Sequence, residues 1–257
     1  MRTITILLLL LLSTGCSYLN KRDEDEAKNW TVEKLYAEAK KSMDTGFYTK
    51  AKEYYEILET RYPFGVVGRQ SLLDLAYVYY KTEKYDEAIS ACDRYIRLYP
   101  QNAAIDYAYY LKGLVNFDKG KGLADRILST DTSQRDPAAA LQAFQTFKEL
   151  GDKFPDSIYL KDVQQRMTYL RNLLAQYEIN VARYYMRRGA FVAAANRGRY
   201  VVENYDRTAS VPEALVIMAK CYKIMGINDL YEDAVRVLRL NYPEHEGIKE
   251  LEITEVR

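Results

Sequence analysis

Apolar residues recur at three- and four-residue steps along the stretch from Arg69 to Pro100, on both sides of a polar break at Lys81 to Lys84. The apolar positions are Leu72, Leu75, Ala76, Tyr79 and Tyr80 before the break, and Ala88, Cys92, Tyr95, Ile96 and Tyr99 after it. This spacing predicts two amphipathic helices joined by a short turn. One such hairpin leaves an apolar face uncovered, so it needs similar hairpins beside it.

The chain supplies four further hairpins. Five apolar helical runs end on an aromatic residue, and in four of them a proline follows to stop the helix. The pairs are Tyr62-Pro63, Tyr99-Pro100, Phe154-Pro155, Tyr205-Asp206 and Tyr242-Pro243. Alanines stand twelve residues before the second member of the first four pairs, at Ala51, Ala88, Ala143 and Ala194, and a further set stands at Ala39, Ala76, Ala182 and Ala219. In the fifth hairpin the position is Tyr231, which departs from the pattern.

These spacings resemble the tetratricopeptide repeat, with small residues on both helices and a terminal proline. We therefore predict an all-α fold, an α-solenoid of five tetratricopeptide-like hairpins, as a single domain over residues 31–257. The repeats are expected at about 31–63, 69–100, 105–155, 159–206 and 211–243, followed by a capping tail.

The amino terminus has the features of a lipoprotein signal. An apolar run from Ile4 to Leu12 is far shorter than the roughly 20 residues that span a bilayer, and small residues lead to Cys16. We expect a signal peptide at 1–15 and a diacylglycerol and N-acyl lipid on Cys16, which would anchor the chain to a membrane surface. The alternative is an ordinary secretory signal with an incidental cysteine. Residues 16–30 are polar and predict a flexible tether.

Two irregular features interrupt the repeats. Residues 119–135 form an insertion too long and polar for a hairpin turn, which is either a partner-specific feature or a tolerated insertion. Helical periodicity then continues without proline or glycine from Tyr159 to Arg188. Five arginines and no acid lie between Val181 and Arg199: Arg183, Arg187, Arg188, Arg197 and Arg199. Such a one-sign cluster is either a solvated face or a surface for an acidic partner.

Composition excludes several functions. The chain has 37 basic and 36 acidic residues, a balance that gives no general attraction to nucleic acid. Cys92 and Cys221 lie three repeats apart inside amphipathic helices and are expected to be buried thiols. The one histidine, His245, has no His or Cys at ligand spacing, so no metal site is predicted. No phosphate loop or dinucleotide fingerprint is present, and we predict no catalytic residues, no cofactor and no enzymatic activity.

Several short motifs in a fixed order resemble the BamD family, the lipoprotein subunits of the outer-membrane β-barrel assembly machinery. They are Arg61 to Gly65, Leu73 to Leu75, Tyr77 to Lys81, Asp93 to Leu98, Ile105 to Tyr107, Arg135 to Pro137, Tyr184-Tyr185 with Arg188 to Ala190, and Asn196-Arg197. The resemblance implies a scaffold without enzymatic activity, anchored by lipid to the outer membrane on its periplasmic face. Its implied partners are the periplasmic domains of BamA, other lipoproteins of the complex and unfolded outer-membrane proteins.

The resemblance also implies roles for individual residues. Arg187, Arg188 and Arg197 would lie on or near the BamA-facing surface. Tyr62, Phe64, Gly65, Arg94 and Arg97 would line the region that receives substrate, where aromatics and arginines suit an extended peptide that ends in an aromatic residue and a carboxylate. Alternatively, Tyr62 and Phe64 staple adjacent hairpins, and Arg94 and Arg97 are solvated. Two other functions stay open: a general periplasmic scaffold for envelope or cell-wall enzymes, and a repeat-bearing enzyme.

Overall fold

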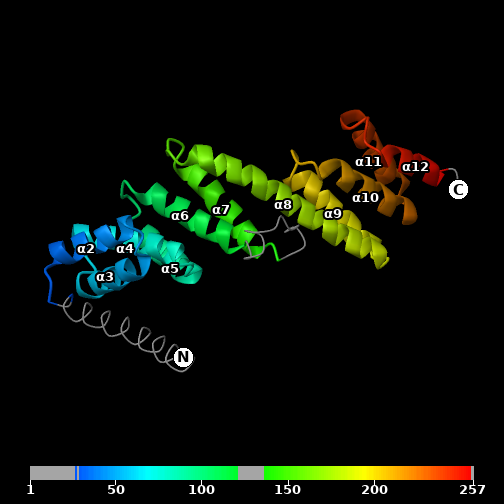
Figure 1. Ribbon diagram of the computed structural model, residues 1–257. Coiled ribbons are helices and arrows are strands. Elements are labelled where there is room, and N and C mark those ends of the chain that lie inside the picture. The colour runs from blue at the N-terminus through cyan, green and yellow to red at the C-terminus, as the bar shows by residue number, and fades with distance from the viewer. Residues whose placement is uncertain (1–26, 28, 121–135, 256–257) are drawn as a thin grey trace, which may run out of the picture. The chain divides into compact units, whose positions relative to one another are not determined.

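The computed structural model describes residues 27, 29–120 and 136–255, and all regular structure in these ranges is helical (Figure 1). The helices are α2 (Val32–Asp44), α3 (Tyr48–Arg61), α4 (Gly65–Lys81), α5 (Tyr85–Leu98), α6 (Ile105–Lys119), α7 (Ala138–Lys153), α8 (Leu160–Arg187), α9 (Phe191–Asn204), α10 (Val211–Ile224), α11 (Asn228–Asn241) and α12 (Gly247–Glu255). They pack in sequential, hairpin-like pairs. The predicted all-α class of helical hairpins is therefore confirmed.

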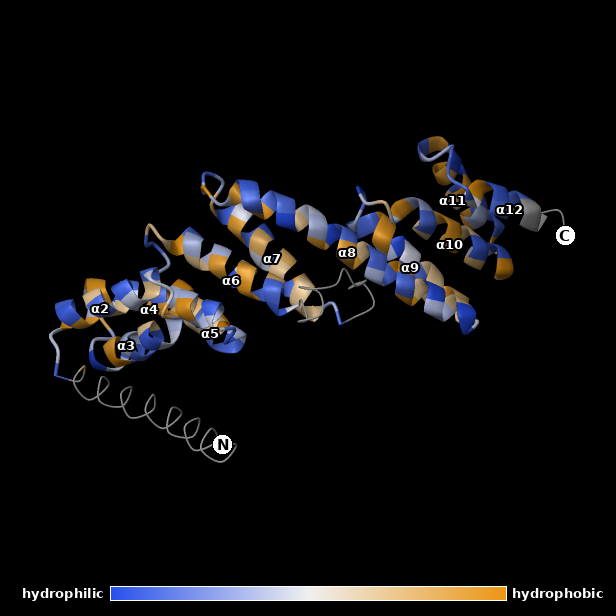
Figure 2. Ribbon diagram, in the orientation of Figure 1, coloured by the Kyte–Doolittle hydropathy of each residue, from blue (hydrophilic) through white to orange (hydrophobic). Residues whose placement is uncertain are grey.

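The described helices belong to two compact units that divide inside α6, between Val115 and Asn116. In the first unit, α2 packs on α3, α3 on α4 and α4 on α5. The four alanines predicted to sit between these helices, Ala39, Ala51, Ala76 and Ala88, are all fully buried. Large side chains surround them, including Tyr55 and Leu58. Figure 2 shows apolar and polar residues on each of these helices, as an amphipathic hairpin requires.

A buried carboxylate lies in the core of the first unit. Asp74 of α4 is 9% exposed and accepts hydrogen bonds from the hydroxyls of Tyr36 and Tyr55, each at 3.1 Å, and from the Gln70 amide at 3.0 Å. Burial, together with the charge of Asp74, raises the pKa of both tyrosines above the ordinary range, which keeps them as neutral donors. The carboxylate thus ties three helices together through hydrogen bonds instead of an ion pair.

The second unit contains α7 to α12. Its α8 has 28 residues and confirms the long helix predicted from Tyr159 to Arg188. Ala143, Ala182, Ala194 and Ala219 are again fully buried. At the irregular position of the fifth hairpin, Tyr231 is half-buried and its ring lies 5.2 Å from Lys223 Nζ. The last helix, α12, packs on α10 and α11 and buries Leu251.

The second helix of each hairpin ends in the same way. The aromatic residues at the predicted ends have φ between −131° and −138° and ψ between 45° and 68°. Each donates its backbone N–H to the carbonyl four residues earlier: Tyr62, Tyr99, Phe154, Tyr205 and Tyr242. Tyr205, which Asp206 follows, adopts the same conformation as the four that precede proline, so proline is not required for this ending.

The remaining expectations concern the amino terminus and the insertion. The signal peptide at 1–15, Cys16, the tether up to residue 26 and the insertion between 121 and 135 lie outside the described residues. Further along, Ala27 is fully buried and Trp30 packs on Tyr54, with ring centroids 5.5 Å apart. Thr31 caps α2 by accepting from the Lys34 backbone N–H. No helix in the described ranges is both long and apolar enough to cross a bilayer.

Candidate functional site

A hollow of about 510 Å³ lies along one face of α5 in the first unit. Helix α5 supplies most of its lining, and α3 and α4 each add one residue. The lining residues are Glu59, Tyr79, Asp86, Glu87, Ser90, Ala91, Arg94 and Arg97. We call this site the α5 hollow. It contains two of the five residues predicted to receive substrate, Arg94 and Arg97.

Charge in the α5 hollow is divided along the helix. Asp86 and Glu87 lie in the first turn of α5, and Arg97 lies in its last turn. Arg94 forms an ion pair with Glu59 of α3, and its Nε is buried without a hydrogen-bond acceptor among the described residues. The hollow thus has an acidic end and a basic end.

Tyr79 forms part of the wall of the α5 hollow. Its hydroxyl donates to Glu56 Oε1 at 2.9 Å. Burial and this hydrogen bond raise the pKa of Tyr79 above its ordinary range, so the phenol stays neutral. Because the hydroxyl is already engaged, the wall is less polar than the two charged ends.

The other three predicted substrate residues lie outside the α5 hollow's lining. Tyr62 is half-buried and accepts from Arg61 Nη2 at 3.0 Å. Phe64 immediately precedes α4 and is 80% exposed, which contradicts the alternative in which it packs hairpins together. Gly65 has φ +84°, a conformation that favours glycine. The structure therefore presents Phe64 at the surface beside a fixed turn.

The arginine cluster of the second unit is less one-signed than its sequence indicates. Arg183 Nη2 lies 2.5 Å from Glu213 Oε1, and Arg197 Nη1 lies 3.0 Å from Glu178 Oε2. Burial acts to lower the pKa of Arg197, but the hydrogen bond and charge of Glu178 outweigh it and raise that pKa. Glu178 lies only three residues before the acid-free stretch, so a wider sequence window would have found it.

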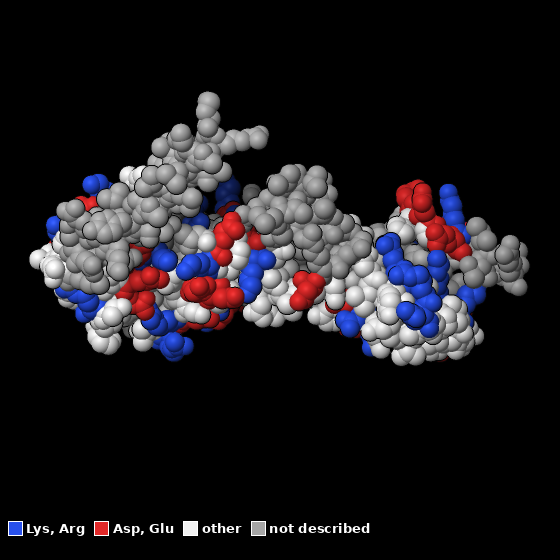
Figure 3. Space-filling view, turned by 60° about the horizontal axis from the view of Figure 1, so that its bottom comes forward, with Lys and Arg blue, Asp and Glu red and all other residues white. Residues whose placement is uncertain are grey.

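Arg187 and Arg188 are exposed, as are Arg183 and Arg199, but the latter two pair with Glu213 and Glu203. Arg187 makes no ion pair with any described residue, and the Arg188 guanidinium lies 5.5 Å from the Tyr184 ring centroid. Arg187 also lines a hollow of about 510 Å³ along α8 with Tyr177, Tyr184 and Tyr185. Figure 3 shows a group of Lys and Arg side chains on one face of the carboxy-terminal unit, and interleaved charges on the amino-terminal unit. Arg187, Arg188 and the adjacent tyrosines offer cationic and aromatic contacts to an acidic partner.

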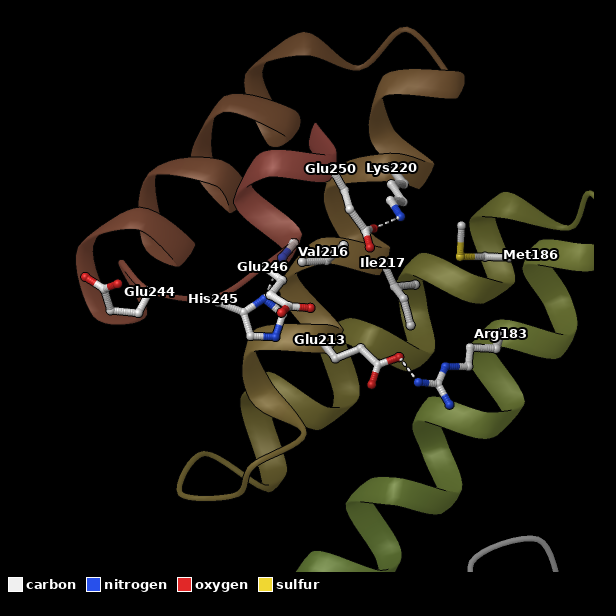
Figure 4. Close-up of a pocket in the computed structure, with 11 residues that line it drawn as sticks. Arg183, Met186, Glu213, Val216, Ile217, Lys220, Glu244, His245, Glu246 and Glu250 are labelled. Carbon is white, nitrogen blue, oxygen red and sulfur yellow. Dashed lines mark hydrogen bonds and ion pairs between the residues drawn. The ribbon is translucent and has the colours of Figure 1, made fainter. Parts of the chain in front are cut away.

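A third cavity, which the sequence did not reveal, lies between α8, α10 and α12 (Figure 4). Its volume is about 570 Å³, and two ion pairs cross it: Arg183 with Glu213, and Lys220 Nζ with Glu250 Oε2 at 2.6 Å. These residues come from three separate segments, so no local sequence signal joins them.

His245 lines the same cavity, and its Nδ1 accepts from the Gly247 backbone N–H at 3.1 Å. No group of three or more potential metal ligands occurs in the part of the chain that the structure describes. The cavity is thus crossed by internal ion pairs, and we assign it no ligand.

Comparisons with known proteins agree with one another. A family model described as YfiO, outer membrane lipoprotein, matches residues 28–238. A protein of Neisseria gonorrhoeae is 43% identical, over 94% of this chain and 91% of its own length. Proteins of Xylella fastidiosa (strain 9a5c) and Vibrio cholerae are 38% and 33% identical, over 95% and 93% of this chain and 83% and 98% of their own lengths. All three carry the name outer membrane protein assembly factor BamD.

Proposed function

Because the chain belongs to the BamD family of outer membrane lipoproteins, we propose that its two units bind different partners. The protein is an outer membrane protein assembly factor, a scaffold without enzymatic activity in the β-barrel assembly complex. The amino-terminal unit receives unfolded outer-membrane proteins, and the carboxy-terminal unit binds the periplasmic domains of BamA. Lipid on Cys16 holds both units at the periplasmic face of the outer membrane.

One observation carries the substrate half of this proposal: Phe64, an 80% exposed aromatic, and Arg97, a guanidinium without an ion-pair partner among the described residues, both belong to the first unit. Exposed aromatic rings and guanidinium groups bind extended peptides that carry aromatic residues and a carboxylate. Tyr62 ends α3 and Gly65 begins α4 on either side of Phe64, and Arg94, paired with Glu59, lines the α5 hollow beside Arg97.

Substrate binding is tested with a fluorescent peptide that ends in phenylalanine and a free carboxylate. Phe64→Ala and Arg97→Gln should each weaken binding to the full chain by about fivefold to tenfold. Phe47→Ala is a matched control, because Phe47 is also an exposed aromatic, at 69%, in the same unit. Equal effects of Phe47→Ala and Phe64→Ala would contradict a specific role for Phe64.

The partner half of the proposal rests on Arg187 and Arg188, which are exposed beside Tyr184. The double variant Arg187→Glu with Arg188→Glu reverses both charges without breaking an ion pair within the described residues. We expect it to reduce recovery of BamA about tenfold when the tagged protein is pulled from detergent-solubilised envelope. Arg197→Glu should also reduce recovery, but it places a carboxylate against Glu178 and disturbs the fold as well.

Arg207→Glu is the matched control for the BamA experiment. Arg207 belongs to the same unit, its side chain is 86% exposed, and its contact with Asp206 is long, at 3.9 Å. Unchanged recovery in this variant would show that net charge alone does not decide binding. Recovery of cell-wall enzymes in place of BamA by the native protein would instead support the alternative of a general envelope scaffold.

Other lipoproteins of the complex are also expected among the partners, and the same pull-down identifies them. The lipid anchor is tested separately: Cys16→Ala should abolish incorporation of labelled fatty acid and release the protein from the membrane fraction. Continued membrane association of the alanine variant in a strain without the other complex members would contradict anchoring through Cys16.

A further inference from the structure

The two ends of the α5 hollow carry opposite charge. Arg94 is neutralised by Glu59, whereas Glu87 and Arg97, near the two ends of the helix, keep charges that a ligand can meet. Neither Glu87 nor Arg97 forms an ion pair within the described residues, although both line the hollow. A ligand that brings only a carboxylate would satisfy one end and leave the acidic end unmatched.

We propose that the α5 hollow recognises a client segment by two charges: a carboxylate at Arg97, and a lysine or arginine side chain at Asp86 and Glu87. This inference rests on the proposed function, in which the first unit receives unfolded outer-membrane proteins. It adds that the acidic end selects among clients. Asp86 and Glu87, which the sequence did not single out, are then specificity-determining residues.

The distance between the charged ends fixes the spacing in the client. Glu87 and Arg97 are ten positions apart on α5, which at 1.5 Å per residue is about 15 Å. An extended peptide advances about 3.3 Å per residue, so this distance matches four to five residues. The cationic side chain should therefore stand about four or five positions before the terminal carboxylate.

The middle of the hollow suits uncharged residues in the client. Ala91 is 8% exposed, and Tyr79 presents a ring whose hydroxyl is already donated to Glu56. A small wall residue and a phenyl ring contact apolar side chains, whereas a third charge there would lose water without gaining a partner. The expected client pattern is thus a basic residue, an uncharged interval and a carboxylate.

Acidic residues in the first turn and basic residues in the last turn also complement the helix dipole. On that explanation alone, the charges would stabilise α5 and would not discriminate between peptides. The experiment must therefore measure discrimination, and it must separate the spacing of the charges from net charge.

The probe is a set of four fluorescent ten-residue peptides that share a terminal phenylalanine, and their affinities for the full chain are measured at low and high salt. Positions are counted from the carboxyl terminus. The first peptide has a lysine at the fifth position and a free terminal carboxylate, and the second has glutamine in place of that lysine. The third has the lysine at the ninth position, and the fourth keeps the lysine at the fifth position but ends in an amide. We expect the first to bind about threefold to tenfold more tightly than each of the others at low salt. High salt should reduce the difference.

Two variants assign the charges to the two ends. Asp86→Asn with Glu87→Gln should remove the preference for lysine and keep the preference for the carboxylate. Arg97→Gln should do the reverse. Ser90→Ala is a control within the same hollow and should preserve both preferences, because its hydroxyl donates to the Asp86 backbone carbonyl.

Each other outcome counts against a stated part of the proposal. If the lysine and glutamine peptides bind equally well, or if the position of the lysine is immaterial, the two-charge inference is wrong and substrate binding by the first unit stands. If the Asn and Gln double variant keeps its lysine preference, the acidic end lies elsewhere. If none of the peptides binds, the substrate half of the proposed function fails together with the inference.

Discussion

The amino-terminal unit holds a carboxylate in its core by hydrogen bonds, whereas the ion pairs that the structure describes in the carboxy-terminal unit keep their cationic side chains partly exposed, even where the carboxylate, as in Glu178, is only 12% exposed. Asp74 is 9% exposed and hydrogen-bonded to two tyrosines, but Arg183 and Arg197 remain 48% and 43% exposed in their ion pairs. A buried acceptor is costly to leave unmatched, and a surface ion pair contributes little. Similar helical hairpins therefore depend on polar groups to different degrees in the two units.

Each unit contains one buried thiol that can report its opening separately. Burial raises the pKa of the Cys92 thiol in the first unit to about 12, and that of Cys221 in the second unit to about 11. Both thiols are therefore protonated and inaccessible in the folded protein. Their alkylation rates measure local opening, because the thiolate is the form that reacts.

The largest effect should come from Asp74→Ala. The variant leaves the hydroxyls of Tyr36 and Tyr55 without their acceptor, and we expect a loss of about 3 kcal/mol in the stability of the first unit. Alkylation of Cys92 should speed up by about a hundredfold, while that of Cys221 should not change.

Tyr36→Phe is the graded control for Asp74→Ala, because it removes one donor and leaves no group unmatched; it should cost about 1 kcal/mol. If Asp74→Ala accelerates the alkylation of Cys92 and Cys221 equally, the two units do not open separately, and the buried carboxylate does not distinguish the stability of the first unit from that of the second.

The next effect tests close packing in the second unit. A Cβ on Gly198 of α9 would lie 2.8 Å from Met218 Cγ and 3.0 Å from the Ala214 carbonyl oxygen, both on α10. Gly198→Ala should destabilise this unit by about 1 to 2 kcal/mol, as seen in faster alkylation of Cys221 with Cys92 unchanged.

Gly151→Ala provides the matched control, since the nearest atom to its Cβ, Leu160 Cδ2, is at an ordinary 3.8 Å. At this position the higher helix propensity of alanine should stabilise the second unit by about 0.5 kcal/mol. A destabilisation by both substitutions would show that helix contacts at Gly198 are not the cause.

The hairpin turns give a third comparison. In the second unit the turns use Gly189 and Gly226, each with φ +72°, whereas the α4–α5 turn of the first unit has Glu83 at φ +60°. Non-glycine residues are strained in this region by about 1 to 2 kcal/mol. Glu83→Gly should therefore stabilise the first unit by about 1 kcal/mol after the entropy cost of glycine, and slow the alkylation of Cys92.

Gly226→Ala should instead destabilise the second unit by about 1 kcal/mol, which faster alkylation of Cys221 would detect. If Glu83→Gly leaves the stability of the first unit unchanged, contacts of the glutamate side chain offset the backbone strain. A Glu83→Ala variant, which removes these contacts and keeps the strain, would separate the two effects.

The repeat pattern made the helices predictable because each hairpin obeys the same packing rule. All eight alanines predicted between helices are fully buried, and the aromatic helix ends share one backbone conformation. The sequence pattern linked those ends to proline, yet Tyr205 adopts the same conformation without one. An aromatic residue, not proline, is therefore the feature that all five endings share.

The candidate sites were harder to predict because they combine residues from separate helices. The sequence placed Arg197 in an acid-free stretch, but Glu178 is 19 positions earlier and contacts it across the α8–α9 pair. Arg94 of α5 likewise meets Glu59 of α3 only because both helices pack on α4. Sequence spacing along one helix shows which charges share a face, and the neighbouring helix decides which of them are neutralised.

The smallest effect concerns the attachment of α12. The hydrogen bond from Lys220, together with its charge, lowers the pKa of the Glu250 carboxyl below its usual range, and His245 adds to this. A carboxyl whose pKa is depressed in the folded state stabilises that state above the ordinary pKa of about 4.3, and this contribution is lost as the pH falls. Both side chains are partly exposed, so we expect less than about 0.5 kcal/mol, or about a twofold change in hydrogen exchange of the α12 amides. In Glu250→Gln, the α12 amides should be less protected from hydrogen exchange at neutral pH and should lose less protection when the pH is lowered. If this variant loses as much protection on acidification as the native protein, the titrating group lies elsewhere in the cavity between α8, α10 and α12.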